Sequence, residues 1–244
     1  MRKVCFVSAL ASLLFLVAFT ATAGQSADIG AQCGARSGKL PPGAVIQAAD
    51  DGSMTVDAVG DWEFFAEHEG TWSREKRIKV TCTCESGGGG CNPTYIQGSV
   101  MCVMSTCSTC TSSGARFVAF DGTNDSISFA TSDDIKKLRP ANNLLLSVPE
   151  VSAALDQFKI DNGAVSDAKG KADSYRYVPI NVYGHLAALV VPADSKAALL
   201  PNAKRKANIT CGCESGGGGC SKESSWGVTW CEAGGCSSCS MTVD

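Results

Sequence analysis

The sequence predicts an α+β protein in which two disulfide-stapled β-hairpin modules, related by internal duplication, flank a small mixed α/β segment. Three observations support this fold class. The N-terminus has the pattern of a secretion signal, twelve of the fourteen cysteines fall in two tight clusters, and the segment between the clusters contains no cysteine but has ordinary globular patterning. These features divide the chain into a signal peptide (1–23), an N-terminal lead-in with short strands (24–75), a first cysteine module (76–112), a central mixed α/β segment (113–203) and a second cysteine module (204–244).

The signal peptide is indicated by the order of its residue types. Arg2 and Lys3 give a positive start, the stretch 4–19 is almost wholly apolar, and Ala21-Thr22-Ala23 has the small-x-small pattern of a cleavage site. The apolar stretch is shorter than the ~20 residues that a membrane-spanning helix needs, which favours cleavage over anchoring. We therefore expect a secreted or periplasmic mature chain that begins near Gly24 and contains no membrane span.

The charge balance argues against a nucleic-acid partner. The full chain carries a net charge of −3, and removal of Arg2 and Lys3 leaves 19 basic and 24 acidic residues, a net charge of −5. This balance provides no basic stripe of the kind that binds phosphate backbones.

The lead-in is rich in Gly, Pro, Ala and Asp. Short strands are expected at Ala44–Ile46 and Met54–Val56, and the aromatic patch Trp62–Phe65 is expected to pack under the first module. Cys33 lies outside both clusters, and the sequence leaves its role open.

The two cysteine clusters have the same spacing. Every cysteine of the first cluster has a counterpart 129 positions later, and 15 of 30 positions are identical between Thr81–Cys110 and Thr210–Cys239. This self-similarity is typical of an internal duplication. The first cluster contains Cys82, Cys84, Cys91, Cys102, Cys107 and Cys110, and the second contains Cys211, Cys213, Cys220, Cys231, Cys236 and Cys239.

Each module is predicted to be a β-hairpin with a glycine tip. Apolar and polar residues alternate up to Cys84 and up to Cys213, as in half-buried strands. A Glu-Ser-Gly-Gly-Gly-Gly loop follows, and Tyr95–Met104 and Trp226–Cys231 are plausible return strands. The remaining cysteines form a tail that wraps back over the hairpin.

Strand geometry limits the disulfide pairing. Cys82 and Cys84 lie two strand positions apart, which is too far for an easy bond between them, so each is expected to reach a cysteine across the hairpin or in the tail. The favoured pairs, Cys84–Cys91 and Cys213–Cys220, would close the glycine loops. Other connectivities are left open.

The central segment has patterns typical of both strands and helices. In chain order we expect strands at Arg116–Phe120 and Ser126–Ala130, a short helix capped by Ser132 and running through Leu138, a second helix from Ser147 to Asn162-Gly163, strands at Tyr175–Val182 and Leu186–Val191, and a short helix Ser195–Leu200 capped by Asp194.

The expected export and the even cysteine counts favour structural disulfides. The leading hypothesis is an exported, non-catalytic structural or partner-binding protein without a cofactor. The alternative is a protein that binds zinc or copper through the thiolates of the twelve clustered cysteines, since C-x-C and C-x2-C pairs are common half-sites for soft metals.

A redox or hydrolytic enzyme is the weaker hypothesis. The C-x-x-C pairs Cys107–Cys110 and Cys236–Cys239 are not followed by helix-forming residues. His68 and His185 lie in no metal or triad motif, and Asp121–Asp125 departs from a calcium loop. The sequence therefore identifies no catalytic residue.

The second return strand has an aromatic face that the first one lacks. Trp226, Val228 and Trp230 alternate on it. The favoured interpretation is burial against the central segment, and the alternative is a contact surface for an extracytoplasmic protein or a glycan.

Overall fold

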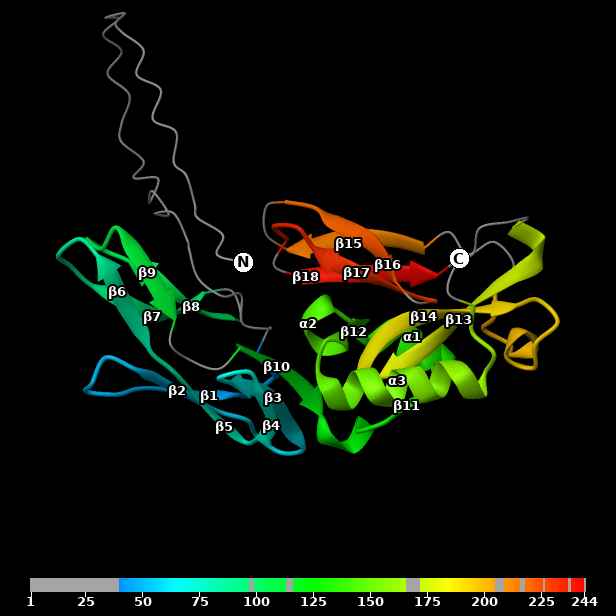
Figure 1. The fold of residues 1–244 in the computed structure, drawn as a ribbon, viewed down its shortest axis with the longest axis horizontal. Helices are drawn as coiled ribbons and strands as arrows, with labels where there is room; N and C mark the ends of the chain where they lie inside the picture. Colours follow the sequence, from blue (N-terminus) through cyan, green and yellow to red (C-terminus); the bar gives the residue numbers. More distant parts are fainter. Residues whose placement is uncertain are drawn as a thin grey trace, which may run out of the picture.

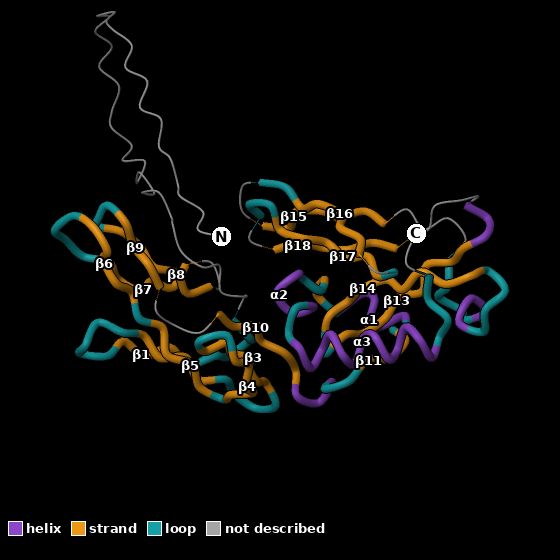
Figure 2. The backbone as a smooth tube through the Cα atoms, viewed as in Figure 1, coloured by secondary structure: helices purple, strands orange, loops and turns teal. Residues whose placement is uncertain are grey.

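A computed structural model describes residues 40–96, 99–112, 116–165, 172–204, 209–215, 218–225, 227–236 and 238–243. The predicted signal peptide and Cys33 lie outside these residues. The described residues are mostly β-sheet, with 52% of them in strands and 17% in helices, so the predicted α+β class holds in coarse form. Figure 1 and Figure 2 show strand-rich structure at both ends of the molecule, with helix α3 on the side that carries the C-terminal residues.

Two three-stranded antiparallel sheets form the first lobe. One has the order β1-β2-β5 and the other the order β10-β3-β4. Their strands are β1 (Val45–Ala48), β2 (Met54–Asp57), β3 (Trp62–His68), β4 (Thr71–Glu75), β5 (Arg77–Val80) and β10 (Arg116–Asp121).

Strand β3 separates the two largest apolar cores because its side chains alternate between the two faces of its sheet. Phe64 packs with Ile78, Val80 and Val100 in the core of the first lobe. Phe65 faces the other way and packs into the core of the second lobe. The aromatic patch therefore packs under the first module as predicted, but through Trp62 and Phe64 and not as a whole.

The second lobe is built on a mixed sheet of order β11-β13-β14-β17-β16, with β12 pairing in parallel with β14. Its strands are β11 (Ile127–Phe129), β12 (Arg139–Pro140), β13 (Tyr175–Val182), β14 (His185–Pro192), β16 (Cys220–Ser225) and β17 (Val228–Ala233). The helices are α1 (Ser132–Lys137), α2 (Asn143–Leu146), α3 (Pro149–Asp161) and the short 3-10 helices η1 (Gly122–Asn124), η2 (Ala172–Ser174) and η3 (Ala197–Leu199).

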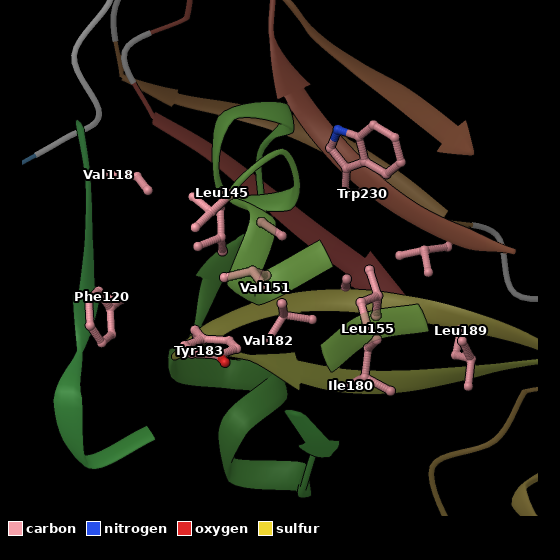
Figure 3. Packing of buried hydrophobic residues seen from close by; sticks show 14 of the residues in the cluster. Val118, Phe120, Leu145, Val151, Leu155, Ile180, Val182, Tyr183, Leu189 and Trp230 are labelled. Atoms are coloured by element: carbon pink, nitrogen blue, oxygen red, sulfur yellow. The ribbon is translucent and has the colours of Figure 1, made fainter. Parts of the chain in front are cut away.

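This sheet is covered on both faces. Figure 3 shows Leu145 of α2 and Val151 of α3 near Val182 of β13, with Trp230 of β17 on the same side. On the opposite face, Leu186 and other residues of the sheet pack against a two-stranded ribbon made of β15 (Ile209–Ser215) and β18 (Ser238–Val243).

The first cysteine module consists of two antiparallel ribbons. Strand β6 (Cys82–Ser86) pairs with β9 (Thr109–Ser112), and β7 (Cys91–Ile96) pairs with β8 (Ser99–Met104). The predicted hairpin across the glycine loop is therefore wrong. The loop crosses from one ribbon to the other, because the tail strand β9 and not β7 is the partner of β6.

The second module repeats this arrangement with the same register. Cys84 lies opposite Cys110, and Cys213 lies opposite Cys239. The ribbon β16–β17 corresponds in the same way to β7–β8. It differs in one respect: Ala188 and Leu189 of β14 pair with β17, so the second module continues the central sheet.

Most of the elements predicted for the lead-in and the central segment are confirmed. The predicted strands correspond to β1, β2, β10, β11, β13 and β14, and the predicted helices correspond to α1, α3 and η3. The caps differ. Thr131, not Ser132, forms the capping box of α1, and the hydroxyl of Ser195, not Asp194, accepts the N–H of Ala198 at 3.2 Å. Helix α2 was not predicted.

Candidate functional site

The twelve clustered cysteines form six disulfides, three in each module. In both modules the first cysteine pairs with the fourth, the second with the fifth and the third with the sixth. The bonds are Cys82–Cys102, Cys84–Cys107 and Cys91–Cys110 in the first module, and Cys211–Cys231, Cys213–Cys236 and Cys220–Cys239 in the second.

The favoured pairs Cys84–Cys91 and Cys213–Cys220 are wrong. Cys84 lies on β6 beside the tail, and its partner is Cys107. Cys91 begins the other ribbon and reaches Cys110 of β9. The more general expectation is confirmed, since both Cys82 and Cys84 bond to a cysteine of the return strand or the tail.

The C-x-x-C pairs are not redox pairs in this structure. Cys107 and Cys110 bond to cysteines of β6 and β7, not to each other. Cys236 and Cys239 are likewise bonded to Cys213 and Cys220. Each of these bonds links a strand of the module to the segment that carries its last two cysteines, as structural cross-links do.

The buried cluster of the first module is made of sulfur-bearing residues. Cys91, Cys102, Cys107 and Cys110 are its buried members, and Met104 packs against them together with the remaining two cysteines. A module with so little aliphatic surface depends on its cross-links, each of which typically contributes ~2–4 kcal/mol. The second module differs, because Cys231 packs with Leu186 and other aliphatic residues in a larger core.

The glycine loops lie against the tails of their modules. A Cβ atom on Gly89 would lie 1.8 Å from Oγ1 of Thr106, and one on Gly218, the equivalent position, would lie 2.6 Å from the carbonyl carbon of Gly235. Ser108 N–H donates to the carbonyl of Ser86 at 2.9 Å and holds the loop in place. Glycine at this position is thus a requirement of close packing.

Sulfur atoms of neighbouring disulfides approach each other in both modules. The sulfurs of Cys82, Cys91 and Cys102 lie within 4.8 Å of one another, as do those of Cys213, Cys220 and Cys236. All six are bonded in disulfides. A disulfide sulfur is not a thiolate, so the zinc or copper hypothesis applies to these residues only when they are reduced.

For two residues of the aromatic face of the second module, the favoured interpretation, burial, is confirmed, and the alternative of a contact surface is wrong for them. Val228 and Trp230 are 2% and 7% exposed and belong to the core of the second lobe, and Trp226 lies outside the described residues. The indole N–H of Trp230 donates to Oε2 of Glu232 at 3.2 Å, and the same oxygen accepts the N–H of Asn143, the first residue of α2, at 2.8 Å. These residues join the module to the central segment.

The two histidines have local partners. Nε2 of His68 lies 2.9 Å from Oε1 of Glu75 on the neighbouring strand. Nδ1 of His185 lies 3.1 Å from the carbonyl oxygen of Tyr183. Burial, with a smaller effect of Arg139, lowers the pKa of His185 to about 4, so its imidazole is neutral near pH 7.

In the loop Asp121–Asp125, which departs from a calcium loop, the carboxylate of Asp121 accepts its hydrogen bonds from neighbouring residues of the same loop. The carboxylate of Asp121 accepts the N–H and the hydroxyl of Thr123 at 2.9 and 2.7 Å, and the amide of Asn124 at 3.1 Å. Asn124 in turn accepts from the amide of Asn181 at 3.2 Å. This network fixes the connection between β10 and the central sheet.

A polar junction between the lobes was missed by the sequence reasoning. Arg74 of β4 forms an ion pair with Glu150 of α3, and its guanidinium lies 5.5 Å from the ring centroid of Phe65 and 5.2 Å from that of Phe120. The hydroxyl of Tyr183 donates to Glu150 at 3.4 Å, and burial is the main cause that raises the pKa of this phenol. Residues so far apart in sequence carry no common motif.

Comparisons with protein-family models, curated proteins and solved structures find no match for this chain. Within the described ranges, no helix has the length and apolar character needed to cross a membrane. The disulfides therefore define the class: the chain is a cysteine-rich, disulfide-stabilised protein that is mostly β-sheet.

Proposed function

We propose that this chain is an exported, non-catalytic scaffold whose first cysteine module contacts an extracytoplasmic partner. Six disulfides are typical of proteins that fold in an oxidising compartment, and the N-terminal sequence has the pattern of an export signal.

The observation that carries the proposal is that the two modules are attached to the rest of the chain in different ways. The second module is joined to the central sheet through the pairing of β17 with β14, and Trp230 packs in the core of the second lobe. In the first, the ribbons β6–β9 and β7–β8 are each a two-stranded sheet of their own. Figure 1 shows these ribbons at the end of the molecule far from the central sheet. The matching register and connectivity of the two modules support an origin by internal duplication, and among the described strands only the second copy pairs with the central sheet.

A rigid module is suited to recognition because little conformational entropy is lost when it binds. Tyr95 on β7 is 50% exposed, and an exposed tyrosine supplies apolar area and a hydroxyl at low entropic cost. The equivalent residue of the second module is Ser224. The contact surface is thus expected on the ribbon β7–β8 of the first module and not on the second.

Export is tested by expressing the full chain in a secreting host and counting free thiols in the culture medium under denaturing, non-reducing conditions. We expect secretion, cleavage near Gly24, and no free thiol apart from Cys33. Retention inside the cell, or free thiols among the twelve clustered cysteines, would contradict the proposal.

Partner contact is tested by chemical cross-linking in the native extracytoplasmic fraction. Tyr95→Ser should lower the yield of the cross-linked species at least several-fold. Ile160→Ser removes an exposed apolar residue on α3, 73% exposed, and should leave the yield unchanged. Equal yields from Tyr95→Ser and wild type would show that the first module is not the contact surface.

A further inference from the structure

The six disulfides differ in how far solvent reaches their cysteines. Cys213 is the one exposed member of the twelve clustered cysteines, all of which belong to the part of the chain that the structure describes. Its partner Cys236 is buried, with 6% of its surface exposed. Cys91 and Cys110 are both buried, so their bond is covered at both ends. A thiolate must reach a disulfide sulfur in order to attack it, so access selects the bond that reacts.

We infer that the bond Cys213–Cys236 is a site of thiol–disulfide exchange, at which a dithiol attacks the sulfur of Cys213. Exposed disulfides are the labile ones, because a thiolate reaches them without prior unfolding of the protein. The inference concerns the reactivity of the oxidised, folded protein. It goes beyond the partner contact proposed for the first module and does not depend on it.

The equivalent bond of the first module, Cys84–Cys107, is more covered. Cys84 is half-buried, and the carbonyl oxygens of Ser86 and Gly87 lie 3.4 and 3.1 Å from its sulfur. The N–H of Ser108 donates to the carbonyl of Ser86 at 2.9 Å and holds this part of the loop in place. Carbonyl oxygens carry partial negative charge, so they repel an incoming thiolate in addition to occupying space. We therefore expect this bond to react more slowly than its counterpart.

The exchange consists of two substitutions at sulfur. In the first, one thiolate of the dithiol bonds to Sγ of Cys213, the Cys213–Cys236 bond breaks, and its electron pair leaves with Sγ of Cys236, which takes a proton from solvent. In the second, the other thiolate attacks the dithiol sulfur of the mixed disulfide, and Cys213 leaves and is protonated. The protein gains two electrons and two protons, and the dithiol becomes a disulfide. The carbonyl oxygen of Ser238, 2.9 Å from Sγ of Cys236, is placed to accept the S–H that forms there.

This bond is not what attaches the second module to the central sheet. The attachment is made by the pairing of β17 with β14 and by Trp230, which packs in the core of the second lobe. The two other disulfides of the module join different cysteines and take no part in the exchange. The attack on Cys213 therefore requires no opening of the central sheet.

The experiment treats the full oxidised chain, whose free thiols have been blocked, with limiting dithiothreitol under native conditions. New thiols are trapped at intervals with N-ethylmaleimide and located by mass spectrometry. We expect Cys213 and Cys236 to be labelled at least several-fold faster than every other clustered cysteine. Their rate should rise with dithiothreitol concentration but not with urea below the unfolding transition, because the attack needs no unfolding. Faster labelling at another bond, or simultaneous labelling of several bonds, would overturn the inference.

A monothiol identifies the sulfur that is attacked. With 2-mercaptoethanol as the probe, the first mixed disulfide should form on Cys213, and its formation on Cys236 would overturn the assignment. Cys84→Ser with Cys107→Ser is the matched control, since it removes the equivalent bond of the first module. It should leave the reaction rate at Cys213 unchanged. A loss of that rate would mean that the exchange passes through the first module, which would also overturn the inference.

Discussion

Arg74 and Glu150 form an ion pair that joins β4 of the first lobe to the first turn of α3 in the second. The guanidinium is placed over Phe65 and Phe120, whose rings stack with centroids 4.2 Å apart. The carboxylate of Glu150 also lies where a helix favours negative charge. The junction thus combines an ion pair, a cation–π contact and a helix terminus.

Arg74→Ala should lower the free energy of unfolding by about 1–2 kcal/mol, because the ion pair and the cation–π contact each contribute roughly 0.5–1 kcal/mol at a partly exposed site. Urea denaturation measures the change. Arg77→Ala is the control, since its ion pair with Asp57 is a surface pair on the first lobe and has little effect on stability. Equal effects of the two substitutions would show that the junction adds nothing beyond an ordinary surface pair.

Gly89→Ala should destabilise the first module by about 1–3 kcal/mol, because the added methyl group would collide with Thr106 of the tail. The thermal unfolding midpoint and the yield of correctly paired protein measure this effect. Gly88→Ala is the matched control: a Cβ atom at Gly88 meets nothing within 4 Å. If the two variants behave alike, the close approach of loop and tail does not exist in solution.

Loss of one disulfide should affect the two modules differently. Cys82→Ala with Cys102→Ala removes ~2–4 kcal/mol from a module whose buried cluster is made of cysteines. We expect fast hydrogen exchange across the ribbon β7–β8. Cys211→Ala with Cys231→Ala should leave β16–β17 protected, because β17 remains paired with β14 and Trp230 remains in the core. Similar exchange in the two ribbons would contradict this asymmetry.

Acidification should destabilise the protein through His185. Its pKa is about 4 in the folded state and 6.5 in its ordinary state, so the unfolded chain binds the proton more tightly. The stabilisation is complete above pH 6.5, and it is lost as pH falls from 6.5 towards 4, by up to about 3 kcal/mol. His185→Gln should flatten the dependence of unfolding free energy on pH in this window. If the variant and wild type have parallel pH profiles, the imidazole is not buried as described.

Much of the fold follows from local sequence patterns. Runs rich in apolar residues indicate β13 and β14, and Asn162-Gly163 ends α3, with Gly163 at φ 62°. The repeated spacing predicts two equivalent modules, and both have the same connectivity. The alternation of Val228 and Trp230 likewise points to a buried face of β17.

The rest depends on long-range pairing that no local pattern encodes. The predicted disulfide pair Cys84–Cys91 is wrong because proximity in sequence favours these two residues, whereas the pairing of β6 with β9 brings Cys107 to Cys84. The partners Arg74 and Glu150 are 76 residues apart and belong to no motif. Helix α2 is a single turn whose start is fixed by the side chain of Asn142 and by Glu232 from β17.

The pairing of β17 with β14 also sets an order for folding. Each bond of the first module joins residues 19 to 23 positions apart, so this module can close as soon as its own residues are free to meet. The central sheet must wait, because its strand β17 follows β14 only after β15 and β16 have been synthesised. A chain that is synthesised from the N- to the C-terminus would therefore complete the first cysteine module early and the central sheet late.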